Sequence, residues 1–296
     1  MGRESGILPP MRRVAAWLIF PVCFSLVFGG SLAALERGVA VGTVTLVATL
    51  GSVALVAGLE RIQPFVADWN HSKGDLATDA LYLPTYLGVN ALVEPFVRVA
   101  AVATGAALSE AVGMGLWPTE WSLLAQSVLA CVVVEAFDYW PHRWLHEVPA
   151  LWRFHAIHHN PKRVYFLNAT RSHPVEIAFR GVANVIPLAL LGASAEVIAM
   201  VAVANAILGM FQHANVDFEL GPLTWIFSVG EMHRWHHSVD LAEANANYGS
   251  NFLFWDVVFG TRFRDPSRRA PDEVGIQDDD LPTAWWPQLW APFRSR

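Results

Sequence analysis

The stretch VAAWLIFPVCFSLVFGGSLAAL, residues 14–35, holds 22 residues without a formal charge, and GVAVGTVTLVATLGSVALVAGL, residues 38–59, holds 22 more. A helix needs about 20 apolar residues to cross roughly 30 Å of hydrocarbon. Each stretch therefore predicts a membrane-spanning helix. Arg12 and Arg13 give the first stretch the charged front of a signal peptide. Its length and the second span behind it favour a retained anchor, because the apolar part of a signal peptide is only about 7–15 residues long.

The composition agrees with a membrane protein. Hydrophobic residues make up 54% of the 296 residues and charged residues only 16%, which is more apolar than an ordinary soluble domain. Cys23 and Cys131 both lie in apolar segments, which argues against a disulfide framework and a cysteine-based zinc site. The formal charge of -6 says little about partners. No nucleic-acid partner is expected.

Two further apolar regions are less regular. Residues 81–108 predict either one broken span or a re-entrant pair, because four residues interrupt them: Pro84, Glu94, Pro95 and Arg98. Residues 121–134 continue through Glu135 and Asp138 toward His142. This second region predicts a span that runs out of the bilayer.

Residues 182–212 form the last apolar region. Pro187 and Glu196 divide it into pieces of 14 and 16 residues. Each piece is short for a crossing of the bilayer, so the region predicts a re-entrant hairpin that dips into one leaflet.

Basic residues predict the orientation. They precede the first span, follow the second and surround the histidine-rich segments; they are Arg12, Arg13, Arg61, Arg143, Arg153, Lys162, Arg163, Arg171, Arg180, Arg234, Arg262, Arg264, Arg268 and Arg269. Lys and Arg are in excess on the cytoplasmic side of membrane proteins. All of these residues, and the histidines among them, are therefore expected on the cytoplasmic side.

Eight of the eleven histidines lie in three short clusters: His142 and His146; His155, His158 and His159; His233, His236 and His237. Residues three or four apart share one face of a helix, so each cluster can present two or three imidazoles together. Neutral imidazole is the commonest protein metal ligand, and eight exceed the needs of one four-coordinate ion. The clusters therefore predict two metal ions. Histidine alone does not choose among iron, zinc, copper and nickel, and the isolated His71 is interpreted as a surface residue.

The pattern HxxxH, HxxHH and HxxHH resembles the fatty acid hydroxylase superfamily, also called the sterol desaturase family, whose members are integral-membrane di-iron oxygenases. EAFDYWPHRWLH (135–146), NATRSHPVE (168–176) and NYGSNFLFWDVVFGTRF (247–263) support the resemblance, which covers roughly residues 63–263. It implies two iron ions as cofactor, O2 as co-substrate, and hydroxylation or desaturation of a fatty acyl, sterol or ether lipid. The expected partners are a lipid substrate and the surrounding membrane lipids.

The source of electrons is expected to be separate. The chain carries no motif for a bound flavin or heme, so a ferredoxin-type or cytochrome-type protein or a diffusible reductant is expected to reduce the metal. The expected fold is all-α: an integral membrane protein with about four transmembrane helices, a re-entrant apolar hairpin and a cytoplasmic helical cap that binds metal. A bacterial inner membrane or its equivalent is the expected location.

The chain is expected to have three parts. Residues 1–62 form the N-terminal transmembrane hairpin, residues 63–263 the catalytic domain that carries the resemblance, and residues 264–296 a tail rich in Trp and Pro. The tail residues Trp285, Trp286 and Trp290 resemble an interfacial belt.

Two further histidines are assigned from the resemblance. His213 in MFQHANVDF is expected to be a ninth ligand, since some family members use a histidine in this region. His173 in RSHPVE is similar to a recurrent family element and is expected to contact a ligand, although the proline behind it suits a structural turn equally well.

Four polar residues are candidates for orienting ligands through hydrogen bonds. Glu135 and Asp138 lie in the helix that leads to His142, and a carboxylate there could accept from the second ring nitrogen of a ligand; a solvated helix end is the alternative. Asn247 and Asp256 belong to the closing motif. Asp256 could brace a ligand in the same way, with capping of a turn as the favoured alternative.

Two other functions stay open. A membrane metal-dependent hydrolase is expected to carry an HExxH helix, whereas Glu147 follows the second histidine of HRWLHE. A metal-binding transporter is expected to place ionisable ligands inside the spans, and these contain little besides Glu94 and Arg98.

Overall fold

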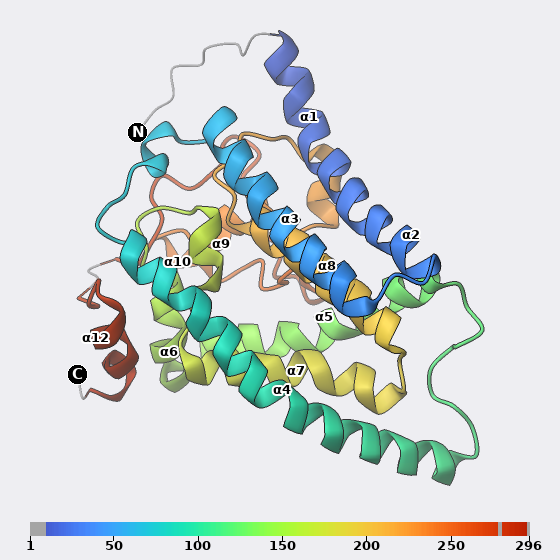
Figure 1. Cartoon of the computed structure of the whole chain (residues 1–296). Coiled ribbons are helices and arrows are strands. Elements are labelled where there is room, and N and C mark those ends of the chain that lie inside the picture. The colour runs from blue at the N-terminus through green and yellow to red at the C-terminus, as the bar shows by residue number, and fades with distance from the viewer. Residues whose placement is uncertain (1–9, 278–279, 295–296) are drawn as a thin grey trace.

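The computed structural model describes residues 10–277 and 280–294, and every regular element in these two ranges is a helix (Figure 1). By length and composition, six helical segments could cross a membrane: Arg12–Glu36, Val41–Ile62, Leu76–Val112, Leu123–Glu147, Pro174–Leu191 and Ala195–Gln212. The prediction of an all-α membrane protein is confirmed. Four of these segments correspond to the expected spans and the last two to the expected hairpin, whose shallow insertion stays a prediction.

The two N-terminal apolar stretches form a helical pair. α1 (Pro10–Phe24), a π-helical turn η1 (Ser25–Gly29) and α2 (Gly30–Glu36) follow one another without a break, and α3 (Val41–Ile62) returns beside them (Figure 1). Phe20 of α1 is buried among Phe211, Phe218 and Phe227, with ring centroids 5.4, 6.0 and 5.0 Å away. α1 therefore contributes to the same apolar core as the helices near the histidines.

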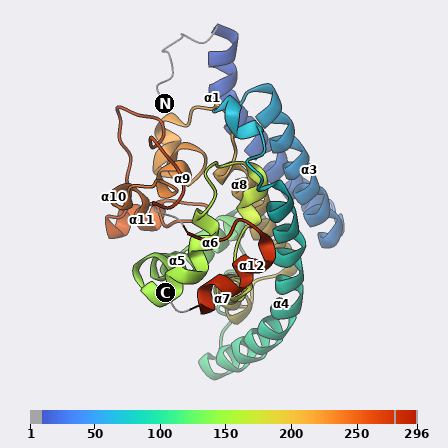
Figure 2. The same cartoon turned by 90° about the vertical axis from the view of Figure 1, so that its left-hand side faces the viewer.

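The region with two prolines is one uninterrupted helix. α4 (Leu76–Val112) has 37 residues and contains Pro84 and Pro95, so it extends over roughly 55 Å. It bends along its length (Figure 2), as expected of a helix that lacks two backbone N–H donors. The expected break is therefore absent, and the region forms one bent helix in place of a re-entrant pair. α4 runs along α7, and its Gly105 lies against the backbone of Leu190.

The predicted hairpin turns at a different residue. α7 (Pro174–Leu191) continues through Pro187 and ends at Gly192, whose φ of 81° is left-handed, and α8 (Ala195–Gln212) begins after Ser194. The predicted interruption at Pro187 is wrong, because a proline bends a helix without having to end it. Glu196, the other predicted point of division, lies in the first turn of α8, just after the observed turn. Glycine has no Cβ and adopts this left-handed conformation at little cost.

The histidine-bearing elements gather at one end of the long helices (Figures 1 and 2). α5 (Leu123–Glu147) has a Ser122 N-cap and runs without a break from its apolar half to His146. Short helices complete this end: α6 (Pro149–His159), α9 (Glu231–His236), α10 (Leu241–Ala244), α11 (Phe254–Phe259) and α12 (Trp285–Trp290). Four 3₁₀-helical turns also lie in the described ranges: η2 (Ala67–Asn70), η3 (Phe166–Thr170), η4 (Gly221–Trp225) and η5 (Ala291–Phe293).

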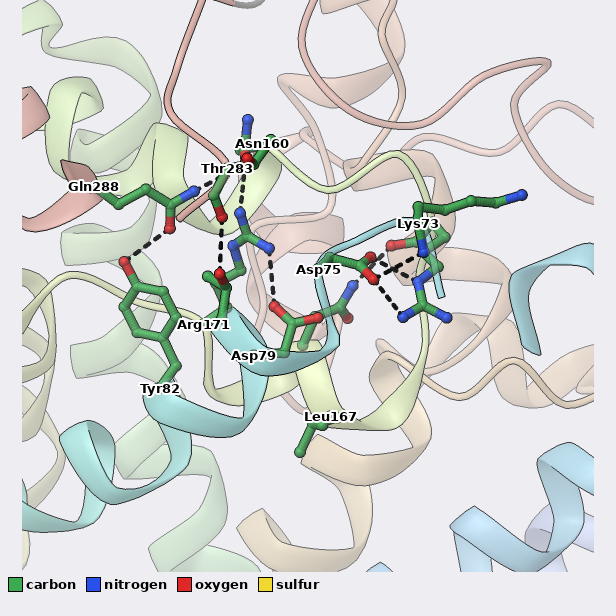
Figure 3. A network of polar contacts seen from close by, with 12 residues as sticks. Lys73, Asp75, Asp79, Tyr82, Asn160, Leu167, Arg171, Thr283 and Gln288 are labelled. Carbon is green, nitrogen blue, oxygen red and sulfur yellow. Dashed lines mark hydrogen bonds and ion pairs between the residues drawn. The ribbon is translucent and has the colours of Figure 1, made fainter. Parts of the chain in front are cut away.

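A buried polar network joins the start of α4 to the loop after α6 and to the C-terminal segment (Figure 3). Two ion pairs are at its centre, Arg163 with Asp75 at 2.7 Å and Arg171 with Asp79 at 2.9 Å. Gln288 of α12 extends the network, because its Oε1 accepts from the Tyr82 hydroxyl at 3.0 Å and its Nε2 donates to the Asn160 side chain at 3.1 Å. The tail is thus fixed to α4 by hydrogen bonds.

Candidate metal centre

The structure brings eight histidines together in two groups of four. Within each group, one ring nitrogen from every histidine lies within 4.8 Å of the others. We call His142, His146, His155 and His236 group A, and His158, His213, His233 and His237 group B. Both HxxHH segments contribute to both groups. His155 and His236 belong to group A, whereas His158 and His237 belong to group B. The two groups are therefore adjacent halves of one centre.

Backbone carbonyls fix the proton positions on two rings of group A. His142 Nδ1 donates to the carbonyl of Tyr248 at 2.6 Å, and His236 Nδ1 donates to that of Ala246 at 2.8 Å. A carbonyl can only accept, so in both neutral rings Nδ1 carries the proton and Nε2 carries the lone pair. These two Nε2 atoms face one another at 3.1 Å. Two lone pairs at this distance repel unless a cation lies between them.

The other two histidines of group A are held by side chains. His155 Nδ1 donates to Glu176 Oε1 at 2.8 Å, and its Nε2 lies 3.2 Å from that of His142. His146 Nδ1 lies 3.3 Å from Asn245 Oδ1, while its buried Nε2 has no hydrogen-bond partner among the described residues. All four rings thus point Nε2 toward the middle of the group.

An asparagine fixes the corresponding proton in group B. Asn168 Nδ2 donates to the carbonyl of Arg163 at 2.7 Å, so Asn168 Oδ1 is the acceptor for His213 Nδ1 at 2.8 Å. His213 Nε2 then presents a lone pair to His233 Nε2 at 3.0 Å. His237 Nε2 lies 3.1 Å from the same atom of His233. Group B therefore repeats the inward-facing arrangement of group A.

His159 lies between the two groups. Its Nε2 is 3.1 Å from His155 Nε2 of group A, and its ring stacks on that of His237 of group B with centroids 4.3 Å apart. It is buried. His159 therefore completes a continuous cluster of nine histidines.

Burial keeps these rings neutral at physiological pH. It lowers the pKa of His213 to about 3 and that of His236 to about 4. Burial also lowers the pKa of five other histidines of the cluster well below the usual value; these are His155, His158, His159, His233 and His237. Neutral imidazole is the form that binds metal.

The donor geometry fits metal ions. Nitrogen atoms that share an ion at about 2.0–2.1 Å lie roughly 2.9–3.4 Å apart for octahedral or tetrahedral coordination. Two Nε2 pairs in each group are separated by 3.0 to 3.2 Å. Hydrogen bonds from Nδ1 to outer acceptors are the usual companions of ligating histidines.

Comparison with known proteins identifies the family. Residues 127–261 match the family model described as fatty acid hydroxylase. The ornithine lipid hydroxylase OlsE of Rhizobium tropici is 38% identical over 248 residues, which are 82% of this chain and 74% of that protein. The chain belongs to the fatty acid hydroxylase family. The resemblance inferred from the histidine pattern is confirmed.

Other members of the fatty acid hydroxylase family are similar over about half of the chain. The alkylglycerol monooxygenase of Danio rerio is 31% identical over 145 residues, 49% of this chain and 31% of that protein. The methylsterol monooxygenase 2-2 of Arabidopsis thaliana is 28% identical over 144 residues, 48% of this chain and 54% of that protein. No solved structure shows a significant match. These relatives identify this member of the family as an oxidoreductase.

The carboxylates expected to orient ligands bind other parts of the chain, namely the backbone of residues 248–251 and the Arg180 side chain of α7. Glu135 accepts from the backbone N–H of Asn251 at 3.1 Å, and Asp138 pairs with Arg180 at 2.5 Å. Asp256 accepts from the N–H groups of Tyr248 and Gly249 at 2.8 and 2.7 Å. The Tyr248 carbonyl accepts from His142. Asp256 therefore contacts the histidine cluster indirectly, through the backbone of Tyr248.

The remaining two candidates also contact backbone. Asn247 has a left-handed φ of 53° and donates to the carbonyls of Met232 and Phe263 at 3.0 and 2.9 Å. His173 caps α7 by accepting from the Val175 N–H at 3.1 Å, and its other ring nitrogen lies 3.1 Å from the Leu289 carbonyl. Its contacts therefore fit the structural turn that was the alternative reading of RSHPVE.

Sequence reasoning missed three residues whose polar side chains contact the histidines at Nδ1: Glu176, Asn168 and Asn245. Two of them stand at the ends of NATRSHPVE, the segment that supported the family resemblance. Glu176 could have been found from the sequence, since it follows His173 by one helical turn at the start of an apolar helix. A buried carboxylate in that position needs a partner.

Proposed function

We propose that this chain is a membrane-bound di-iron oxygenase that hydroxylates a C–H bond of an acyl-bearing membrane lipid. One observation carries the proposal: two groups of four histidines direct their lone pairs inward at the end of a set of apolar helices. The names of its relatives agree with a lipid substrate, namely ornithine lipid hydroxylase, methylsterol monooxygenase and alkylglycerol monooxygenase.

The two groups would each hold one iron ion, and His159 would complete the ligand set between them. The full proposed set is His142, His146, His155, His158, His159, His213, His233, His236 and His237. Reduced iron held there would supply the activation of O2. The chain's own part is to keep nine rings neutral by burial and to orient six of them through contacts at Nδ1. The fixed orientation of the rings would set the position of the metal ions before the lipid binds.

The lipid would approach along α5 from the hydrocarbon. Val128 and Phe137 are 54% and 51% exposed on this helix, and Trp140 and Trp144 follow at 38% and 44%. These apolar side chains lead to the level of His142 and His146. An acyl chain that lies against them could bring a C–H bond to group A without entering water.

Electrons would come from a separate donor that approaches from the cytoplasm, either a ferredoxin-type or cytochrome-type protein or a diffusible reductant. The basic residues around the histidine-bearing end support a cytoplasmic orientation in a bacterial inner membrane. We also propose the three-part division into residues 1–62, 63–263 and 264–296. The match to the family model, at residues 127–261, lies within the middle part.

Labelled oxygen tests the proposal. The purified protein, loaded with Fe²⁺ in lipid nanodiscs, receives a ferredoxin, its reductase and a bacterial polar lipid extract under ¹⁸O₂. Mass spectrometry should show a lipid that has gained one labelled oxygen atom, and only when the reductase is present. A matched sample with His142→Ala should give no product. Turnover without reductant, or oxygen that comes from labelled water, would favour a hydrolase instead.

A further inference from the structure

Glu176 is the one carboxylate that accepts a hydrogen bond from a histidine of group A or group B, within the residues that the structure describes. Its Oε1 accepts from His155 Nδ1 at 2.8 Å, and both side chains are almost fully buried. The other acceptors at Nδ1 are neutral oxygens: the carbonyls of Tyr248, Ala246 and Arg171 and the side-chain amides of Asn245 and Asn168. Groups A and B therefore differ by one carboxyl acceptor.

The position of Glu176 is fixed by the start of α7. His173 caps this helix and Pro174 occupies its first turn together with Glu176, where the helix dipole favours a negative charge. Arg180 lies one turn later, but its guanidinium is bound to Asp138 at 2.5 Å and remains 3.9 Å from Glu176. Glu176 is thus directed at His155.

The corresponding position in group B is an amide. Asn168 Oδ1 accepts from His213 Nδ1, and Asn168 Nδ2 donates to the Arg163 carbonyl. An aspartate could not make this second contact, since a carboxylate is no donor. The group B site therefore requires a neutral side chain, and the difference between the groups is built into the fold.

A carboxylate acceptor strengthens a histidine ligand. It increases the basicity of the ring, and the effect is larger in a buried site because the dielectric is low. Loss of such an outer partner typically lowers metal affinity by about 10–100-fold. An amide or carbonyl acceptor orients the ring without adding charge.

We propose that Glu176 is a positioning residue that makes the two metal sites unequal, so that group A binds its ion first and more tightly. The inference rests on the proposed function, because it takes the histidines as metal ligands. It adds an order of loading and assigns that order to a single side chain.

Co²⁺ titration in two single-site backgrounds tests this inference. His233→Ala impairs group B and leaves group A, while His142→Ala impairs group A and leaves group B. Metal-free protein in nanodiscs is titrated with Co²⁺, and the visible absorption of the ligated ion reports binding. Glu176→Gln should lower the Co²⁺ affinity by about 10–100-fold in the His233→Ala background. The same change in the His142→Ala background should leave the affinity unaltered.

The wild-type chain should show two binding steps, which Glu176→Gln should bring closer together. Thermal unfolding of each metal-free variant checks that the fold is intact. Equal effects of Glu176→Gln in both backgrounds, or no effect in either, would overturn the inference while leaving two bound ions in place. A wild-type chain that binds no Co²⁺ at these histidines would overturn the proposed function itself.

Discussion

Arg171 donates to the Asp79 carboxylate at 2.9 Å, while its own carbonyl accepts from His158 Nδ1 at 3.2 Å. Both charged side chains are buried, at 1% and 0% exposure. One residue therefore connects the first turns of α4 to group B. A change in the position of α4 would be transmitted to a histidine through two hydrogen bonds.

Asp79→Asn should destabilise the protein by about 3–5 kcal/mol, because it leaves the buried Arg171 without its counter-charge. The variant should also lose part of the metal in group B, since the Arg171 carbonyl orients His158. Thermal unfolding in detergent and metal content per chain measure the two effects. Lys73→Ala, which breaks the exposed pair with Asp68, is the matched control and should change neither. Wild-type stability in Asp79→Asn would refute the link.

Gly105→Ala should separate α4 from α7. A Cβ at this position would lie 2.3 Å from the Leu190 carbonyl oxygen, which belongs to backbone and cannot move aside. We expect a loss of about 1–3 kcal/mol from this overpacking. Gly88→Ala on the same helix meets no atom within 4 Å and should be neutral or slightly stabilising. Equal melting temperatures for the two variants would show that the helices are not in close contact.

His213→Ala and His173→Ala should behave differently. His213 belongs to group B, so its loss should lower the bound iron from two ions toward one and abolish turnover. His173 caps α7 through Val175, so its loss should cost about 1 kcal/mol of stability and leave most of the iron bound. Metal analysis and the oxygenation assay on both variants test this order. Full iron content in His213→Ala would remove it from the ligand set.

The metal-free protein should lose stability as the pH falls from about 6.5 toward 4. Burial lowers the pKa of His236 to about 4, whereas a histidine in the unfolded chain titrates near pH 6.5. Below that value the unfolded chain binds protons that the folded chain excludes, so the free energy of unfolding decreases. Bound metal competes with these protons and should extend the stable range.

Thermal unfolding between about pH 7.5 and about pH 4.5, with and without a chelator, measures this dependence. The melting temperature of the metal-free sample should fall first. A melting temperature that is constant over this range would mean that the histidines are hydrated and titrate normally.

The sequence was most informative where side chains carry the signal. The uncharged runs at residues 14–35 and 38–59 predicted helices that the structure contains. The spacing of the clusters predicted that the histidines would share one site, and they do. Hydrophobic length and histidine spacing are both properties of a single segment, so they can be read without knowledge of the fold.

The division of the histidines could not be predicted in this way. His155 and His158 share one face of α6 but belong to different groups, because the partners of each ring come from other segments. Tyr248, Ala246 and Arg171 contribute backbone carbonyls. Every residue has a backbone carbonyl, so residue type does not reveal which carbonyls accept these hydrogen bonds. The end of α7 at Gly192 was also missed, because Pro187 and Glu196 were the more obvious signals.

The contacts of Phe20 imply an order in which segments of the chain pack together. Its aromatic neighbours Phe211, Phe218 and Phe227 follow it in the chain by about 190 residues or more. At roughly 5–20 residues per second, a ribosome needs about 10–40 seconds to produce them. During that time α1 must stay in the lipid without its final neighbours. A substitution at Phe20 should therefore reduce the amount of folded protein in the cell. Each molecule that does fold should keep the complete histidine cluster.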